Sequence, residues 1–187
     1  MRPALLTLLC GLIVVPAALA AGHATGDGVL ELKAVTGQVA IGSPSQPAKG
    51  ALWGQMDKGI LKATDPTGPS DGAVLVSAKD LKKTVVPSSD GGPRTVVYSG
   101  HNLHFRVTGG KYRLMFVNAV GVDLTAIGVG VATLTGDSNA VDPGSYAVDD
   151  DDWQPVPVAG DTAAPAVVPF GTQPPPPPPT TTTTASP

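Results

Sequence analysis

The stretch His101-Asn102-Leu103-His104-Phe105-Arg106-Val107-Thr108-Gly109-Gly110-Lys111-Tyr112-Arg113-Leu114-Met115-Phe116-Val117 alternates apolar and polar side chains on both sides of a glycine pair. This period of two predicts half-buried β-strands over 101–108 and 111–117. Gly109-Gly110 readily takes the positive φ that a two-residue turn requires, so the pattern predicts an antiparallel hairpin. One face of the hairpin is apolar, and we expect its large side chains to be buried in the core: Phe105, Leu114 and Phe116.

The opposite face of the predicted hairpin is cationic. Its register sets Arg106 directly opposite Arg113, and like charges in a cross-strand pair are destabilising. Because guanidinium groups bind carboxylates and phosphates well, an anionic ligand would relieve the repulsion. The simpler alternative is that a carboxylate such as Asp123 neutralises the pair, or that both side chains reach water. The predicted anion-binding patch, for an anionic cell-envelope polymer or glycan, consists of His104, Arg106, Lys111 and Arg113.

The rest of the central segment is also typical of β-structure. Val, Thr and Gly are abundant over residues 27–148, and Gly- or Pro-containing turns recur at short intervals. The sequence therefore predicts one all-β domain over 27–148, an antiparallel sandwich or barrel, with a small β-roll or solenoid as the alternative. The expected strands are 29–35, 37–42, 50–56, 58–64, 73–78, 83–86, 94–99, 101–108, 111–117, 122–127 and 129–135.

Composition excludes several other classes. Only 14% of the 187 residues are charged and Glu31 is the single glutamate, which excludes a coiled coil or helical bundle. One cysteine, Cys10, excludes a disulfide-stapled fold. The acidic pI of 5.4 disfavours a dedicated nucleic-acid binder.

The first twenty residues have the pattern of a secretory signal peptide. A basic start is followed by an apolar run that ends at Pro16, and Ala18-Leu19-Ala20 supplies the small-residue cleavage pattern. The alternative is an uncleaved membrane anchor, but the apolar run is shorter than the ~20 residues that a spanning helix needs. We expect cleavage after Ala20, a cysteine-free mature chain, no transmembrane segment after processing, and a secreted or cell-envelope location.

Residues 149–187 are predicted to be a disordered acidic and Pro/Thr-rich tail. The segment begins with Asp149–Asp152 and contains Pro174–Pro179 followed by Thr180–Thr184, with no basic residue. Consecutive prolines favour an extended polyproline II helix of ~3.1 Å per residue. The expected uses are a spacer, a stalk or an O-glycosylated tract, and the alternative is an unselected low-complexity extension. Trp153 either packs on the edge of the domain or is exposed.

Residues for catalysis or metal binding are few. His101 and His104 are three residues apart, which places them on opposite faces of a strand, so they cannot share a metal ion. Four adjacent aspartates lack the spacing of a calcium loop. No nucleophile elbow, zinc-protease or phosphate-loop motif is present, and only distant residues such as Ser99 and His101 could assemble a Ser/His/Asp site. The sequence therefore predicts no cofactor, no metal ligand and no catalytic residue.

A family resemblance rests on five short segments, which are Val97-Tyr98-Ser99-Gly100, Leu103-His104-Phe105-Arg106, Gly109-Gly110-Lys111-Tyr112-Arg113-Leu114, Gly121-Val122-Asp123-Leu124 and Leu134-Thr135-Gly136-Asp137. These segments resemble secreted β-rich proteins of unknown function from actinobacteria. The resemblance implies export and β-structure, and it carries no activity. The sequence as a whole predicts a secreted non-enzymatic β module that binds or structures extracellular material. The alternative is an extracellular hydrolase whose site is not recognisable from sequence.

Overall fold

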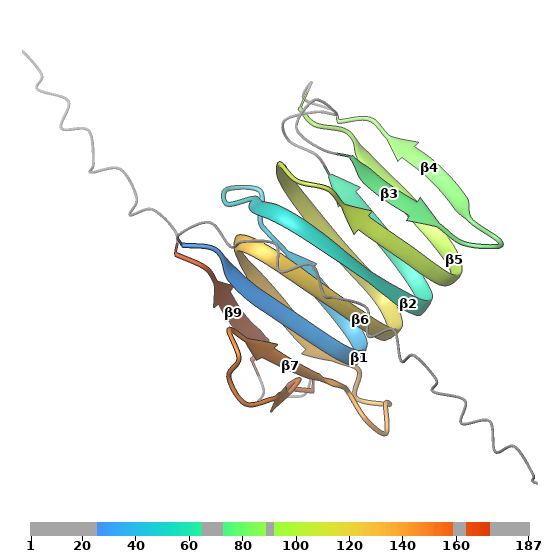
Figure 1. Ribbon diagram of the computed structural model, residues 1–187. Helices are drawn as coiled ribbons and strands as arrows, with labels where there is room; N and C mark the ends of the chain where they lie inside the picture. Colours follow the sequence, from blue (N-terminus) through green and yellow to red (C-terminus); the bar gives the residue numbers. More distant parts are fainter. Residues whose placement is uncertain (1–25, 65–72, 89–91, 159–163, 173–187) are drawn as a thin grey trace, which may run out of the picture.

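The computed structural model describes residues 26–64, 73–88, 92–158 and 164–172 (Figure 1). In these residues the chain is all-β and forms one antiparallel sheet, which confirms the predicted fold class. The signal peptide expected over 1–20 lies outside the described residues. The strands are β1 (Gly28–Ile41), β2 (Ala48–Thr64), β3 (Val74–Ser77), β4 (Lys82–Val86), β5 (Thr95–Val107), β6 (Lys111–Gly136), β7 (Ser145–Val148), β8 (Gln154–Pro155) and β9 (Ala166–Phe170).

The four long strands bend, and each bend carries the chain from one layer of the structure to another. The sequence predicts two short strands where β1, β2 and β5 each form one bent strand, and three where β6 forms one. In β6 the first bend contains Asn118 and Gly121, whose φ values of 48° and 63° lie in the left-handed region that Asn and Gly tolerate best. A bent strand can therefore contribute side chains to both sides of one core.

The bends divide the sheet into two facing layers. The first layer contains residues 28–34, 48–56, 74–77, 103–107, 122–128 and 145–148. The second layer contains residues 37–41, 60–64, 82–86, 95–99, 111–117, 131–136 and 166–170. The short strands β3 and β4 lie at one end of the molecule, and β7 and β9 lie at the other (Figure 1).

The two layers arise because one long antiparallel pair of strands coils around the core. The pair starts at the β4–β5 connection, where Val86 lies opposite Thr95. It continues as β3 with β5, then β2 with β6, then β1 with β6 and β7. The two facing layers resemble a β-sandwich. The coiled path of the strand pair resembles the β-roll that the sequence analysis gave as the alternative.

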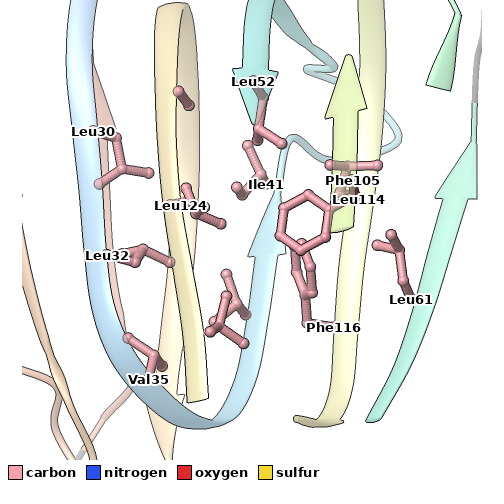
Figure 2. Close-up of a cluster of buried hydrophobic side chains, with 14 of the residues drawn as sticks. Leu30, Leu32, Val35, Ile41, Leu52, Leu61, Phe105, Leu114, Phe116 and Leu124 are labelled. Carbon is pink, nitrogen blue, oxygen red and sulfur yellow. The ribbon is translucent and has the colours of Figure 1, made fainter. Parts of the chain in front are cut away.

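The core lies between the layers. Figure 2 shows β1 turning back on itself, with Leu30, Leu32 and Val35 directed toward the side chains of the other strands. Phe105 of β5 and Phe116 of β6 face each other across the core, with ring centroids 5.0 Å apart. Phe105, Leu114 and Phe116 are each at most 3% exposed, which confirms the predicted core residues.

The predicted hairpin around Gly109-Gly110 is wrong. In the structure β5 pairs with β2, β3 and β4, and β6 pairs with β1, β2 and β9. Val107 lies opposite Leu52 rather than Tyr112. The glycine pair therefore links two layers instead of two neighbouring strands. The same alternation of apolar side chains fits both arrangements, because either one buries a single row from each strand.

The predicted domain boundary at residue 148 is too early. Val156 is 2% exposed, and β9 pairs with the last part of β6 and buries Phe170. Pro169 is compatible with this position because β9 is an edge strand, where a missing N–H group is tolerated. The Asp149 side chain accepts a hydrogen bond from the Val29 N–H at 2.7 Å and joins the start of the predicted tail to β1. The proline and threonine runs lie outside the described residues.

We predict that Phe116→Ala destabilises the protein by about 3–5 kcal/mol, because it removes a fully buried ring that contacts Phe105 and leaves a cavity. Chemical denaturation followed by circular dichroism measures the change. Met115→Ala is the matched control, since the neighbouring Met115 side chain is exposed on the outer surface of the second layer. An equal loss of stability in both variants would contradict the described orientation of β6.

Candidate binding groove

The outer surface of the first layer contains a groove of about 460 Å³. It crosses β1, β6, β2 and β5, and the segment before β8 closes one side. Its walls combine aromatic, acidic, basic and amide side chains. The outward-facing residues that line it are Glu31, Lys33, Trp53, Gln55, His104, Asp123, Thr125 and Trp153.

Two half-exposed tryptophans line the groove and are its largest exposed side chains. Trp53 lies on β2, and Trp153 lies between β7 and β8, a hundred residues later in the chain. Their exposed fractions are 44% and 48%, so much of each indole is available to a ligand. Large exposed aromatic groups that share one concavity are typical of binding surfaces.

The strand register determines the polar side chains around the tryptophans. Trp53 lies between Thr125 of β6 and Arg106 of β5, and two residues along β2 Gln55 lies between Asp123 and His104. Because side chains alternate along a strand, these two rows point to the same outer surface. They provide both hydrogen-bond donors and acceptors.

Asp123 organises one side of the groove. Its Oδ1 accepts a hydrogen bond from the Ala34 N–H at 2.8 Å, and its Oδ2 accepts one from Gln55 Nε2 at 3.5 Å. Ala34 has a φ of 53°, a conformation that is costly for a residue with a Cβ atom. The carboxylate therefore helps hold the bend of β1 next to the groove.

The predicted anion-binding patch does not form as one surface. His104 and Arg106 are exposed on the first layer, where only His104 lines the groove. Lys111 and Arg113 lie on the outer surface of the second layer, and Arg113 is opposite Thr64 rather than Arg106. Phe105 and Phe116 point toward each other, so the alternating cations of the two strands point apart. The predicted patch depended on a pair between Arg106 and Arg113. That pair followed from the hairpin register, which the structure does not have.

A second groove of about 360 Å³ lies at the bend of β5 and contains a histidine–aspartate pair. His101 Nδ1 lies 2.7 Å from Asp80 Oδ2, and the His101 N–H donates to Asp80 Oδ1 at 2.8 Å. Ser99 lines the same groove, but no hydrogen bond joins Ser99 to His101 among the described side chains. The pair therefore acts as a tie between the β3–β4 turn and the bend of β5.

Within the parts of the chain that the structure describes, no three His, Cys, Asp or Glu residues are grouped so that they could hold a metal ion. In the same parts, no helix is long and apolar enough to cross a membrane.

Comparison with known proteins adds no relative. No family model, no curated protein and no solved structure matches the chain.

Trp53 was not among the site residues that the sequence pattern predicted. The signal was present in the alternation of β2, because Leu52 and Met56 point inward and the odd-numbered residues between them must point outward. An outward tryptophan in a strand is a stronger sign of a binding surface than an outward lysine or arginine. Trp153 was noted, but no sequence pattern joins it to Trp53.

The His101–Asp80 tie makes stability depend on pH in the acid range. Hydrogen bonds from the His101 side chain and backbone lower the pKa of Asp80 below its ordinary value of 3.8. A carboxyl group whose pKa is lowered by folding stabilises the protein above its unfolded pKa, and this stabilisation is lost as pH falls through the folded pKa. We predict that Asp80→Asn is less stable than the wild type at about pH 6 and that the difference shrinks below about pH 4. Thermal unfolding across this range measures it, and a constant difference would contradict the tie.

Proposed function

We propose that the protein is an exported, non-enzymatic module that binds a polysaccharide in the groove between Trp53 and Trp153. The observation that carries the proposal is the pairing of two half-exposed indoles, from distant parts of the chain, in one concavity. The signal-peptide pattern of residues 1–20 supports export.

The chemistry of the groove suits a sugar chain. A pyranose ring has apolar C–H faces, which pack on an indole, and hydroxyl groups around its edge, which both donate and accept hydrogen bonds. The two tryptophans supply the flat apolar surfaces. Glu31 accepts, Lys33 and His104 donate, and Gln55 does both. Binding sites of this type combine apolar area with a few polar groups that fix orientation.

The groove favours a neutral or weakly charged glycan over a polyanion. Two carboxylates, Glu31 and Asp123, line it together with Lys33 and His104. The two carboxylates would repel a polyanion, and neither of them belongs to the predicted anion-binding patch. They would not repel an uncharged glycan.

The alternative function is a glycoside hydrolase, because Glu31 and Asp123 line the same groove and paired carboxylates catalyse glycoside hydrolysis. Both oxygens of Asp123 already accept hydrogen bonds from Ala34 and Gln55. This arrangement favours a structural role for Asp123 over proton transfer. Release of reducing ends, compared between the wild type and Glu31→Gln, decides between the two functions.

We predict that Trp53→Ala and Trp153→Ala each weaken glycan binding by roughly tenfold, since loss of an aromatic stack costs about 1.5 kcal/mol. Isothermal titration of the full chain with a neutral glucan, an N-acetylglucosamine oligomer and a uronic-acid polymer measures the effect.

Met115→Ala is the control, because Met115 is about as exposed as Trp53 but lies on the opposite surface. The proposal fails if no saccharide binds the wild type, or if the two tryptophan variants bind as tightly as the control.

A further inference from the structure

The second groove, at the bend of β5, gathers polar side chains from four strands and a turn. They come from the bends of β2, β5 and β6, from the start of β4 and from the β3–β4 turn. The polar residues that line it are Lys58, Asp80, Lys82, Ser99, His101 and Asn118. A concavity in which polar groups from distant parts of the chain converge is typical of a ligand site.

The strand register places the two lysines of this groove on opposite sides of β5. Lys82 of β4 lies opposite Ser99 of β5. Lys58 of β2 lies opposite His101, two residues further along β5. Both lysines are exposed, and their long flexible stems allow the two ammonium groups to approach one ligand that is seated over Ser99.

Four donor side chains of this groove lack a partner within the described part of the chain. No hydrogen bond or ion pair joins them to another described residue, and they are Lys58, Lys82, Ser99 and Asn118. Ammonium groups donate and never accept, and an amide and a hydroxyl can both donate. An anionic ligand would therefore supply the acceptor that all four lack.

Asp80 is the acidic side chain that lines this groove, and His101 engages both of its oxygens. Oδ2 lies 2.7 Å from His101 Nδ1, and Oδ1 accepts a hydrogen bond from the His101 backbone N–H at 2.8 Å. These contacts direct the carboxylate toward His101 and fix the orientation of the imidazole ring. The groove thus presents two unpaired lysine charges against one carboxylate that is already bound.

We propose that the second groove binds a phosphate group. Lysine is a common phosphate ligand. A phosphate group has several strong acceptor oxygens that point in different directions, so it suits donors on three neighbouring strands better than a planar carboxylate does. Inorganic phosphate and the phosphate ester of a larger molecule share this chemistry. The site has no lining residue in common with the tryptophan groove, so the proposal does not depend on polysaccharide binding.

Titration of the full chain, followed by amide proton–nitrogen NMR, tests the site directly. Inorganic phosphate, glycerol phosphate and acetate are added separately to a phosphate-free buffer at constant ionic strength. We expect saturable shifts centred on Ser99, His101 and Asn118 with both phosphates, and non-saturating shifts with acetate. Tighter binding of glycerol phosphate would assign the site to a phosphate ester, and tighter binding of inorganic phosphate would assign it to the free ion.

Two variants and a matched control connect the shifts to the lysines. Lys58→Gln and Lys82→Gln should each weaken phosphate binding roughly fivefold, which is the upper range for a charge pair near the surface. Lys62→Gln removes the same charge from an exposed lysine that is also on β2 but does not line the groove. We expect this control to bind phosphate as the wild type does.

The proposal is wrong if neither phosphate causes saturable shifts at the groove, or if acetate binds as tightly as phosphate. It is also wrong if the groove variants and Lys62→Gln lose affinity equally, because the effect would then be a general attraction of anions to surface lysines. None of these results bears on the tryptophan groove, and the glycan titration tests that groove separately.

Discussion

The fold depends on a single constraint, which is that one alternating row of apolar side chains must be buried along strands too long for a flat sheet. The strand β6 is 26 residues long and crosses the molecule three times, and its buried side chains alternate from Tyr112 to Phe116 and again from Val122 to Leu134. Each crossing keeps the apolar row inward because the chain bends at Asn118 and Gly121 and again near Gly128. The contact between Phe105 and Phe116 exists only because the two layers face each other across this shared core.

The outer surfaces follow from the same constraint. When the apolar row of a bent strand points inward, the alternate residues point outward from two different layers. Trp53 is thus placed on one surface with Gln55 and His104, while Met115 and Arg113 are placed on the other. The groove is a consequence of strand order, since β1, β6, β2 and β5 are neighbours only after the chain has coiled. The segment before β8 then adds Trp153 from a part of the chain that looked like a linker.

The positions of the strands and their buried residues could be predicted from the sequence, whereas the pairing between strands could not. Alternation identified the strands and the buried residues Phe105, Leu114 and Phe116, because burial of one face is a property of the strand itself. The partner of each strand was not predictable, since a glycine pair such as Gly109-Gly110 permits both a hairpin turn and a link between layers. The predicted cationic patch was wrong for the same reason, because it assumed that the strands on both sides of Gly109-Gly110 pair with each other. Composition suggested a free tail from Asp149 onward, yet Val156, Val168 and Phe170 supply just enough apolar surface to return the chain to the core.

Strand pairing around Arg106 tests the account most directly, because the two-layer fold and the groove both depend on it. Nuclear Overhauser effects between backbone protons report which residues are opposite each other in an antiparallel sheet. We expect backbone contacts of Arg106 with Trp53 and Leu75, together with ring contacts between Phe105 and Phe116. Backbone contacts between Arg106 and Arg113 would instead establish the hairpin, and the two-layer arrangement and its groove would both be wrong.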